Sequence, residues 1–143
     1  MIFEKLPKAQ PNDREHLFAV ADCMTKLSKK ARREGILALE EWIDDDDFLP
    51  PSCGKLEDFL FRQIVRMMVD GCDAELIVEF SKNYVLSIDE SEPALLALML
   101  GVRAVLAIQE GYNPRVLVIM LASMMGHPLC EAYIETRFKK ENW

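Results

Sequence analysis

Two groups of side chains in this sequence are of types that could bind a metal ion. His127 and Cys130 are three residues apart, but a closed zinc site takes about four ligands and no other residue is spaced to help. Asp44 to Asp47 lack the alternating ligands and central glycine of a calcium-binding loop. We therefore expect no metal and no cofactor. The acidic run is interpreted as a solvated turn, with a docking patch for basic residues as the alternative.

The residue types needed for catalysis are present but not grouped in the sequence. Neither histidine is placed beside a serine or cysteine that it could activate, and no glycine-rich loop that could cradle a phosphate is found. Distant residues can still converge in a fold, so this observation lowers the expectation of an enzyme without excluding one. The prediction is a protein without enzymatic activity.

Composition limits the classes of partner. The 143 residues suit one domain, residues 1–143, and half of them are hydrophobic, as in a globular protein. The formal charge of −7 argues against nucleic acid, whose phosphates are bound by clustered Lys and Arg. The four cysteines form no CxxC pair, which favours reduced thiols over zinc or disulfides. A basic protein surface is the more plausible partner.

Apolar residues recur at helical spacing along the whole chain, and no strand pattern competes with it. The sequence predicts an all-α fold, a compact bundle of about five to six helices built from capped helical hairpins. The expected helices run from Asn12 or Asp13 to about Ile43, from about Leu56 to Gly71, from Asp73 to the acidic linker 87–93, from Ala94 to Glu110, from Pro114 to Met125 and from Leu129 to about Lys140.

The most apolar runs are too short to span a membrane. Ala94 to Val102 is interrupted by Arg103, and Val116 to Met125 ends at Gly126, whereas a spanning helix needs about 20 apolar residues. The first residues also lack the basic start and apolar stretch of a secretory signal. We expect a cytoplasmic protein without membrane insertion.

Two pairs of segments resemble each other within the chain. "DGCDAELIV" and "EGYNPRVLV" are offset by 40 residues, and each reads as a tight corner between helices. Gly71 or Gly111 takes the left-handed position, Asp73 or Asn113 caps the next helix, and Pro114 begins its helix. "GILALEE" at 35–41 and "AVLAIQE" at 104–110 suggest two related helices. Such hairpins also recur by chance in α-helical proteins.

Three longer stretches point to a known family. "ARREGILALEEWIDDDDFL", "FRQIVRMMVDGCDAELI" and "GVRAVLAIQEGYNPRVLVIMLASMMG" resemble, in this order, the cytoplasmic parts of flagellar stator proteins of the MotA type, in the MotA/TolQ/ExbB proton-channel family. The resemblance covers residues 29–126. Between Tyr84 and Leu95 the family would place two membrane helices, whereas this chain has only "VLSIDESEPA". Proton conduction is therefore not implied.

The resemblance implies a protein interaction module of the bacterial flagellar motor, with a role in motility and chemotaxis. Its partner would be the rotor's switch protein or stator components, at the motor in the cytoplasm. In the family, a basic residue three before the glycine and a Glu five after it face the rotor; here these are Arg32 and Glu40, beside Arg33 and Glu41. On one continuous helix, Arg32 and Glu40 would lie about two turns apart near one face.

Alternatives to this function remain open at the level of sequence. Arg32, Arg33, Glu40 and Glu41 could be only the solvated side of an amphipathic helix. The chain could also be a structural helical protein that assembles with copies of itself and makes no rotor contact. A small-molecule enzyme is a third possibility, and it predicts a concave pocket with converging polar groups.

Overall fold

The computed structural model describes residues 7, 9, 13–89 and 95–140. Within these residues the chain forms seven α-helices and one short 3₁₀ helix, and no strand. The elements are α1 (Arg14–Glu34), η2 (Ile36–Leu39), α2 (Glu40–Ile43), α3 (Lys55–Val69), α4 (Ala74–Leu86), α5 (Leu95–Gln109), α6 (Pro114–Met125) and α7 (Leu129–Lys140). The all-α prediction is confirmed, but the predicted number of helices was slightly too low.

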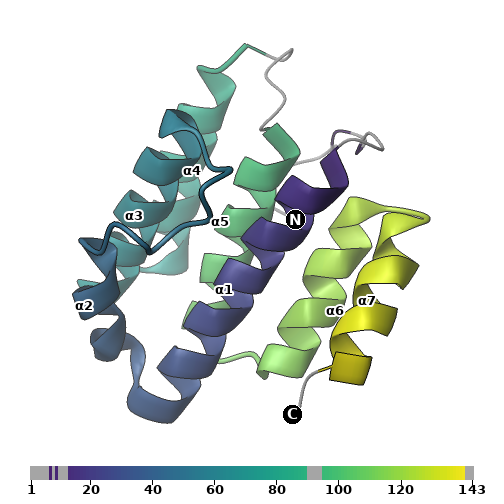
Figure 1. The fold of residues 1–143 in the computed structure, drawn as a ribbon. Coiled ribbons are helices and arrows are strands. Elements are labelled where there is room, and N and C mark those ends of the chain that lie inside the picture. Colours follow the sequence, from purple (N-terminus) through teal and green to yellow (C-terminus); the bar gives the residue numbers. More distant parts are fainter. Residues whose placement is uncertain (1–6, 8, 10–12, 90–94, 141–143) are drawn as a thin grey trace.

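Helix α5 lies at the centre of the bundle. It contacts α1, α3, α4 and α6 (Figure 1). A helix that is apolar on all sides must be buried on all sides, and residues 96–102 and 104–108 of α5 are all buried. Arg103 interrupts this run and lies over the ring of Tyr112, 5.5 Å from its centroid. The apolar character of α5 is therefore explained by its neighbours in the bundle.

Helices α1, α3 and α5 run in one direction, and α4 and α6 run in the opposite direction. Figure 1 shows α1, α3 and α5 ending at the same end of the molecule, from which α4 and α6 return. Helix α7 packs against α6, and α6 packs against α1. None of the helices in the described part of the chain combines the length and apolar character needed to cross a bilayer.

A close approach joins α3 to α5 at Gly101. A Cβ atom at this position would lie 2.0 Å from Cε1 of Phe61, far inside van der Waals contact. Phe61 is fully buried, so its ring occupies the space that a side chain at position 101 would need. Glycine in the middle of this helix is thus explained by packing, since it lowers helix propensity.

The prediction of one continuous helix from Asn12 or Asp13 to about Ile43 is wrong. Helix α1 ends at Glu34, where Gly35 has a φ of 93° and donates its N–H to the carbonyl of Ala31 at 2.8 Å. The chain then continues as η2 and α2, and η2 packs against α1. A positive φ is accessible to glycine and costly for other residues. This turn divides one expected helix into three elements.

The two corners with related sequence have the same backbone geometry. At the first, the N–H of Gly71 donates to Met68 at 3.1 Å and that of Cys72 to Met67 at 2.9 Å. At the second, Gly111 donates to Ile108 and Tyr112 to Ala107, both at 3.0 Å. Both patterns are those of a Schellman motif, with a glycine of positive φ after the helix.

The side chains that begin the following helices complete the two corners. Oδ1 of Asp73 accepts a hydrogen bond from the N–H of Leu76 at 2.9 Å, at the start of α4. Oδ1 of Asn113 accepts one from Arg115 at 2.8 Å, and Pro114 is the first residue of α6. The corners also touch each other, because the side-chain amide of Gln109 donates to the carbonyl of Cys72 at 2.6 Å.

The second pair of similar segments does not share a structure. Residues 35–41 form the Gly35 turn, η2 and the start of α2, whereas residues 104–109 belong to the continuous helix α5. The expectation of two related helices at these positions is therefore wrong. The glycine that begins the first segment has no counterpart in the second, and it is the residue that breaks the helix.

Candidate interaction surface

The four charged residues singled out in the sequence lie on both sides of the Gly35 turn. Arg32 and Arg33 are in the last turn of α1, and Glu40 and Glu41 begin α2. All four are exposed. The expected arrangement on one helix face is contradicted, because the turn places the two pairs on different helices. A partner meeting both pairs would have to contact the turn between them.

Glu41 differs from the other three because it is held by a lysine. Nζ of Lys30 lies 2.6 Å from Oε1 of Glu41 and 3.3 Å from Oε2 of Glu34. The same ammonium group lies over the ring of Trp42, 4.8 Å from its centroid. The hydrogen bond to Glu41 raises the pKa of Lys30, whose side chain is 7% exposed. Lys30 thus fastens α2 to α1.

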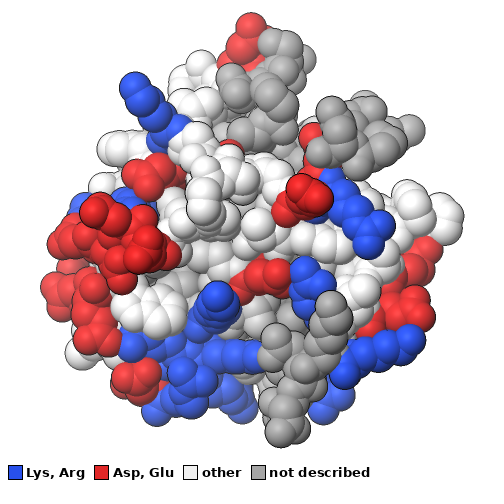
Figure 2. Space-filling view, viewed as in Figure 1, with Lys and Arg blue, Asp and Glu red and all other residues white. Residues whose placement is uncertain are grey.

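Arg32, Arg33 and Glu40 form no ion pair with any residue that the structure describes. Cations in the last turn of a helix interact favourably with its dipole, so Arg32 and Arg33 could stabilise α1 even if no other protein binds them. Their charges are exposed, so a partner protein can also contact them. Figure 2 shows basic side chains gathered over the end of the bundle where α1 finishes, directly beside an acidic region over α2 and the loop after it.

The acidic run belongs to the loop that leads from α2 to α3. Asp44 pairs with Arg66 at 3.2 Å, while Oδ1 of Asp45 accepts the N–H of Asp47 at 2.9 Å. The guanidinium group of Arg62 donates to the carbonyls of Ile43 and Asp45. The run is exposed, as expected of a solvated turn, but its backbone is tied to α3.

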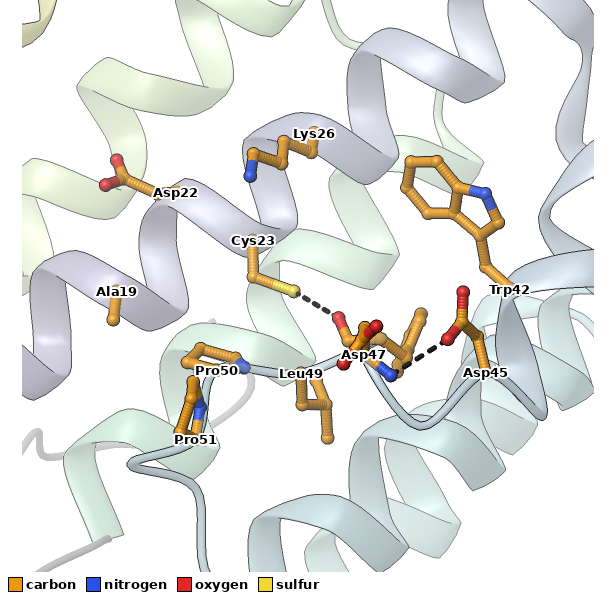
Figure 3. Close-up of a pocket in the computed structure, with 11 residues that line it drawn as sticks. Ala19, Asp22, Cys23, Lys26, Trp42, Asp45, Asp47, Leu49, Pro50 and Pro51 are labelled. Carbon is orange, nitrogen blue, oxygen red and sulfur yellow. Dashed lines mark hydrogen bonds between the residues drawn. The ribbon is translucent and has the colours of Figure 1, made fainter.

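A groove of about 650 Å³ lies between α1 and this loop (Figure 3). Its α1 wall carries residues spaced by three and four positions, which share one face of the helix. The opposite wall comes from Trp42 and the loop. The residues around it are Ala19, Asp22, Cys23, Lys26, Trp42, Asp45, Asp47, Phe48, Leu49, Pro50 and Pro51. The sequence did not predict this groove, since its two walls meet only in the folded chain.

A histidine, a serine and a glutamate converge beyond the groove. Nδ1 of His16 lies 2.7 Å from Oγ of Ser52, and Nε2 lies 2.7 Å from Oε2 of Glu57, which is 2% exposed. The hydrogen bond to Glu57 raises the pKa of His16 against the opposing effect of burial. In the neutral ring, a proton on Nε2 would face Glu57 and Nδ1 would accept from Ser52.

This cluster joins the first turn of α1 to the start of α3. Glu57 also accepts weak hydrogen bonds from Sγ of Cys53 at 3.6 Å and from the N–H of Gly54 at 3.5 Å. Burial and the Glu57 charge raise the pKa of the Cys53 thiol, which makes it a poor nucleophile. These contacts could not be predicted from a local pattern, because His16 and Glu57 are 41 positions apart in the sequence.

Metal binding has no geometric support in the residues that the structure describes, where no three or more His, Cys, Asp or Glu side chains form a possible site. His127 instead pairs with Glu131 one turn further on. The cysteines Cys23, Cys53, Cys72 and Cys130 are free and half-buried. Burial raises the pKa of Cys23 to about 11, so this thiol stays protonated at neutral pH.

Comparisons with protein-family models, with curated proteins and with solved structures found no match to this chain. The geometry described above is therefore the only basis for a function beyond the resemblance in sequence.

Proposed function

We propose that this protein is a MotA-like interaction module of the bacterial flagellar motor, which contacts the rotor's switch protein or stator components and conducts no protons. The observation that carries the proposal is the exposed charge around the Gly35 turn. Arg32, Arg33 and Glu40 stand on two helices that meet there, and no described residue neutralises them. Charges presented in this way favour recognition and orientation of a charged partner.

The turn gives these charges a fixed arrangement. The Lys30 ion pair with Glu41 holds α2 against α1, so the acidic side chain of Glu40 keeps its place relative to the two arginines. Fixed charges cost less ordering on binding than mobile ones. The proposed surface is thus the Gly35 turn with the last turn of α1 and the first of α2, and it needs neither catalytic chemistry nor a cofactor.

Charge reversal tests this proposal. The double variant Arg32→Glu with Arg33→Glu, and separately Glu40→Lys, would be titrated against the purified flagellar switch protein of the same organism by calorimetry. We expect each to weaken binding at least tenfold. Glu79→Lys, on the exposed face of α4, is a control matched to Glu40→Lys. Lys82→Glu on the same helix changes the charge in the direction of the arginine variant, by half as much. Unchanged binding in the turn variants contradicts the proposal.

Self-assembly without rotor contact is the second candidate. The observation in its favour is the apolar exposure of α6, where Val116 and Ile119 are 45% and 47% exposed. Light scattering of the same purified chain separates the two functions. A stable oligomer that is lost in Ile119→Lys, together with no binding to the switch protein, would support the structural role.

A further inference from the structure

The groove between α1 and the loop after α2 has the character of a binding site for a cationic, partly apolar segment. Its volume of about 650 Å³ is within the range of about 300–1,000 Å³ of ligand sites. Ala19 and Cys23 line it from α1, and Leu49, Pro50 and Pro51 from the loop. These side chains give the groove an apolar surface on which hydrocarbon can be buried.

The loop that forms the second wall is held in place, so the groove exists before any ligand arrives. Sγ of Cys23 donates to the carbonyl of Phe48 at 3.1 Å, as the dashed line in Figure 3 shows. Phe48 is 7% exposed, and the guanidinium group of Arg62 lies 5.2 Å from its ring centroid. A preformed site loses less conformational entropy on binding than a loop that must first be ordered.

The charges on the groove do not cancel. Asp22 is already neutralised, since Arg137 contacts its two oxygens at 2.8 and 2.9 Å and Tyr133 donates to it at 2.7 Å. Asp45 and Asp47 are exposed and form no ion pair with any described residue. Only one cation, Lys26, lines the groove. Two unpaired carboxylates therefore stand at its edge against one ammonium group.

We propose that this groove binds a short basic segment of a partner protein, in which Lys or Arg side chains meet Asp45 and Asp47 while an adjacent apolar side chain lies on the surface between α1 and Pro50. A cation with a long hydrocarbon stem matches both the carboxylates and the apolar wall. The net charge of −7 disfavours nucleic acid and anionic lipid and favours a basic protein. This site does not depend on the flagellar assignment.

The four consecutive aspartates supply a matched test. Asp45 and Asp47 line the groove, whereas Asp44 pairs with Arg66 and neither Asp44 nor Asp46 is among the lining residues. Asp45→Asn with Asp47→Asn and Asp44→Asn with Asp46→Asn remove the same charge from the same loop. Asparagine at 45 keeps a side-chain oxygen for the N–H of residue 47, so the loop can retain its hydrogen bond.

The probe is an amphipathic peptide of Leu and Lys, with its Leu and Glu counterpart as a negative control. Trp143→Phe leaves Trp42, which lines the groove, as the one tryptophan of the chain. Trp42 fluorescence would report binding, and amide shifts in NMR spectra would map it. We expect the Lys peptide to shift the amide signals of groove residues. The double variant at Asp45 and Asp47 should weaken binding about tenfold, and the double variant at Asp44 and Asp46 should change it less than twofold.

Three results would overturn the inference. Equal losses in the two double variants would mean that only general charge attraction is involved. Shifts spread away from α1 and the loop would place the peptide elsewhere. Displacement of the peptide by spermidine at an equal concentration would identify the site as one for small polycations. Arg32 and Glu40 do not line this groove. Failure of rotor binding in their charge-reversal variants and failure of peptide binding in the Asp45 and Asp47 variant are therefore separable.

Discussion

Replacing Gly101 by alanine sets helix propensity against packing, and the structure decides which effect is larger. Alanine in the interior of a helix is favoured over glycine by about 1 kcal/mol. The added methyl, however, would lie 2.0 Å from Cε1 and 2.4 Å from Cζ of Phe61, whereas ordinary contact begins near 3.4 Å. The ring would have to withdraw by about 1.4 Å, the difference between 3.4 and 2.0 Å.

The buried surroundings make that withdrawal costly. Phe61 has no exposed surface, and its neighbours Leu60 and Ile64 are fully buried too. Overfilling a packed core costs about 1–3 kcal/mol, and an aromatic ring between two helices has no flexible end to move aside. We take a packing cost of about 3 kcal/mol and subtract the gain in helix propensity of about 1 kcal/mol. Gly101→Ala should therefore lower the free energy of unfolding by about 2 kcal/mol.

Urea unfolding followed by far-UV circular dichroism measures this change. Phe61→Leu alone removes part of the ring and should be destabilising on its own, but it makes room for the methyl group. The double variant should therefore lose less stability than the two single variants together, and the difference, which is the coupling energy, should be at least about 1 kcal/mol. A Gly101→Ala protein as stable as the parent, or more stable, would refute the close packing of α3 on α5.

Three further predictions concern the side-chain contacts of His16, Asp22 and Ser52. The pKa of His16 in the folded state is raised above 6.5, so the stabilisation by protonated His16 is complete below pH 6.5 and is lost as the pH rises through the raised pKa. In urea unfolding, His16→Gln should remove this decrease in the free energy of unfolding, and His127→Gln should not. Asp22→Asn should cost about 1 kcal/mol in thermal or urea unfolding, since it weakens the partly exposed contact with Arg137; an effect no larger than that of Glu135→Gln would contradict this. A protein without enzymatic activity should hydrolyse p-nitrophenyl acetate at the same rate before and after Ser52→Ala, and a slower variant would reveal a catalytic serine.

The corners and the later helices were predictable because their signals are local. Asp73, Asn113 and Pro114 act within one turn of their own positions, and the helices Pro114–Met125 and Leu129–Lys140 have the predicted bounds. At both corners the glycine and the residue after it hydrogen-bond to carbonyls in the last turn of the same helix. Local chemistry of this kind can be inferred from a sequence alone.

The break at Gly35 and the groove were not predictable for different reasons. A single glycine inside an apolar helical pattern costs only about 1 kcal/mol, so the pattern before and after Gly35 favoured one continuous helix. In the folded chain Gly35 instead has a positive φ, and η2 packs against α1 and α3. The groove and the contact of His16 with Glu57 depend on how the loop 44–54 packs against α1. No local pattern in the sequence of this loop predicts its course.

Side-chain hydrogen bonds hold the bundle at both of its ends. The hydrogen bond from Gln109 to Cys72 joins two corners at the end where α3 and α5 finish, whereas that of His16 with Glu57 joins α1 to α3 at the end where these two helices begin (Figure 1). The Gly35 turn lies beside the Gly111 corner, at the end held by Gln109, so a partner bound at this turn would also face that corner.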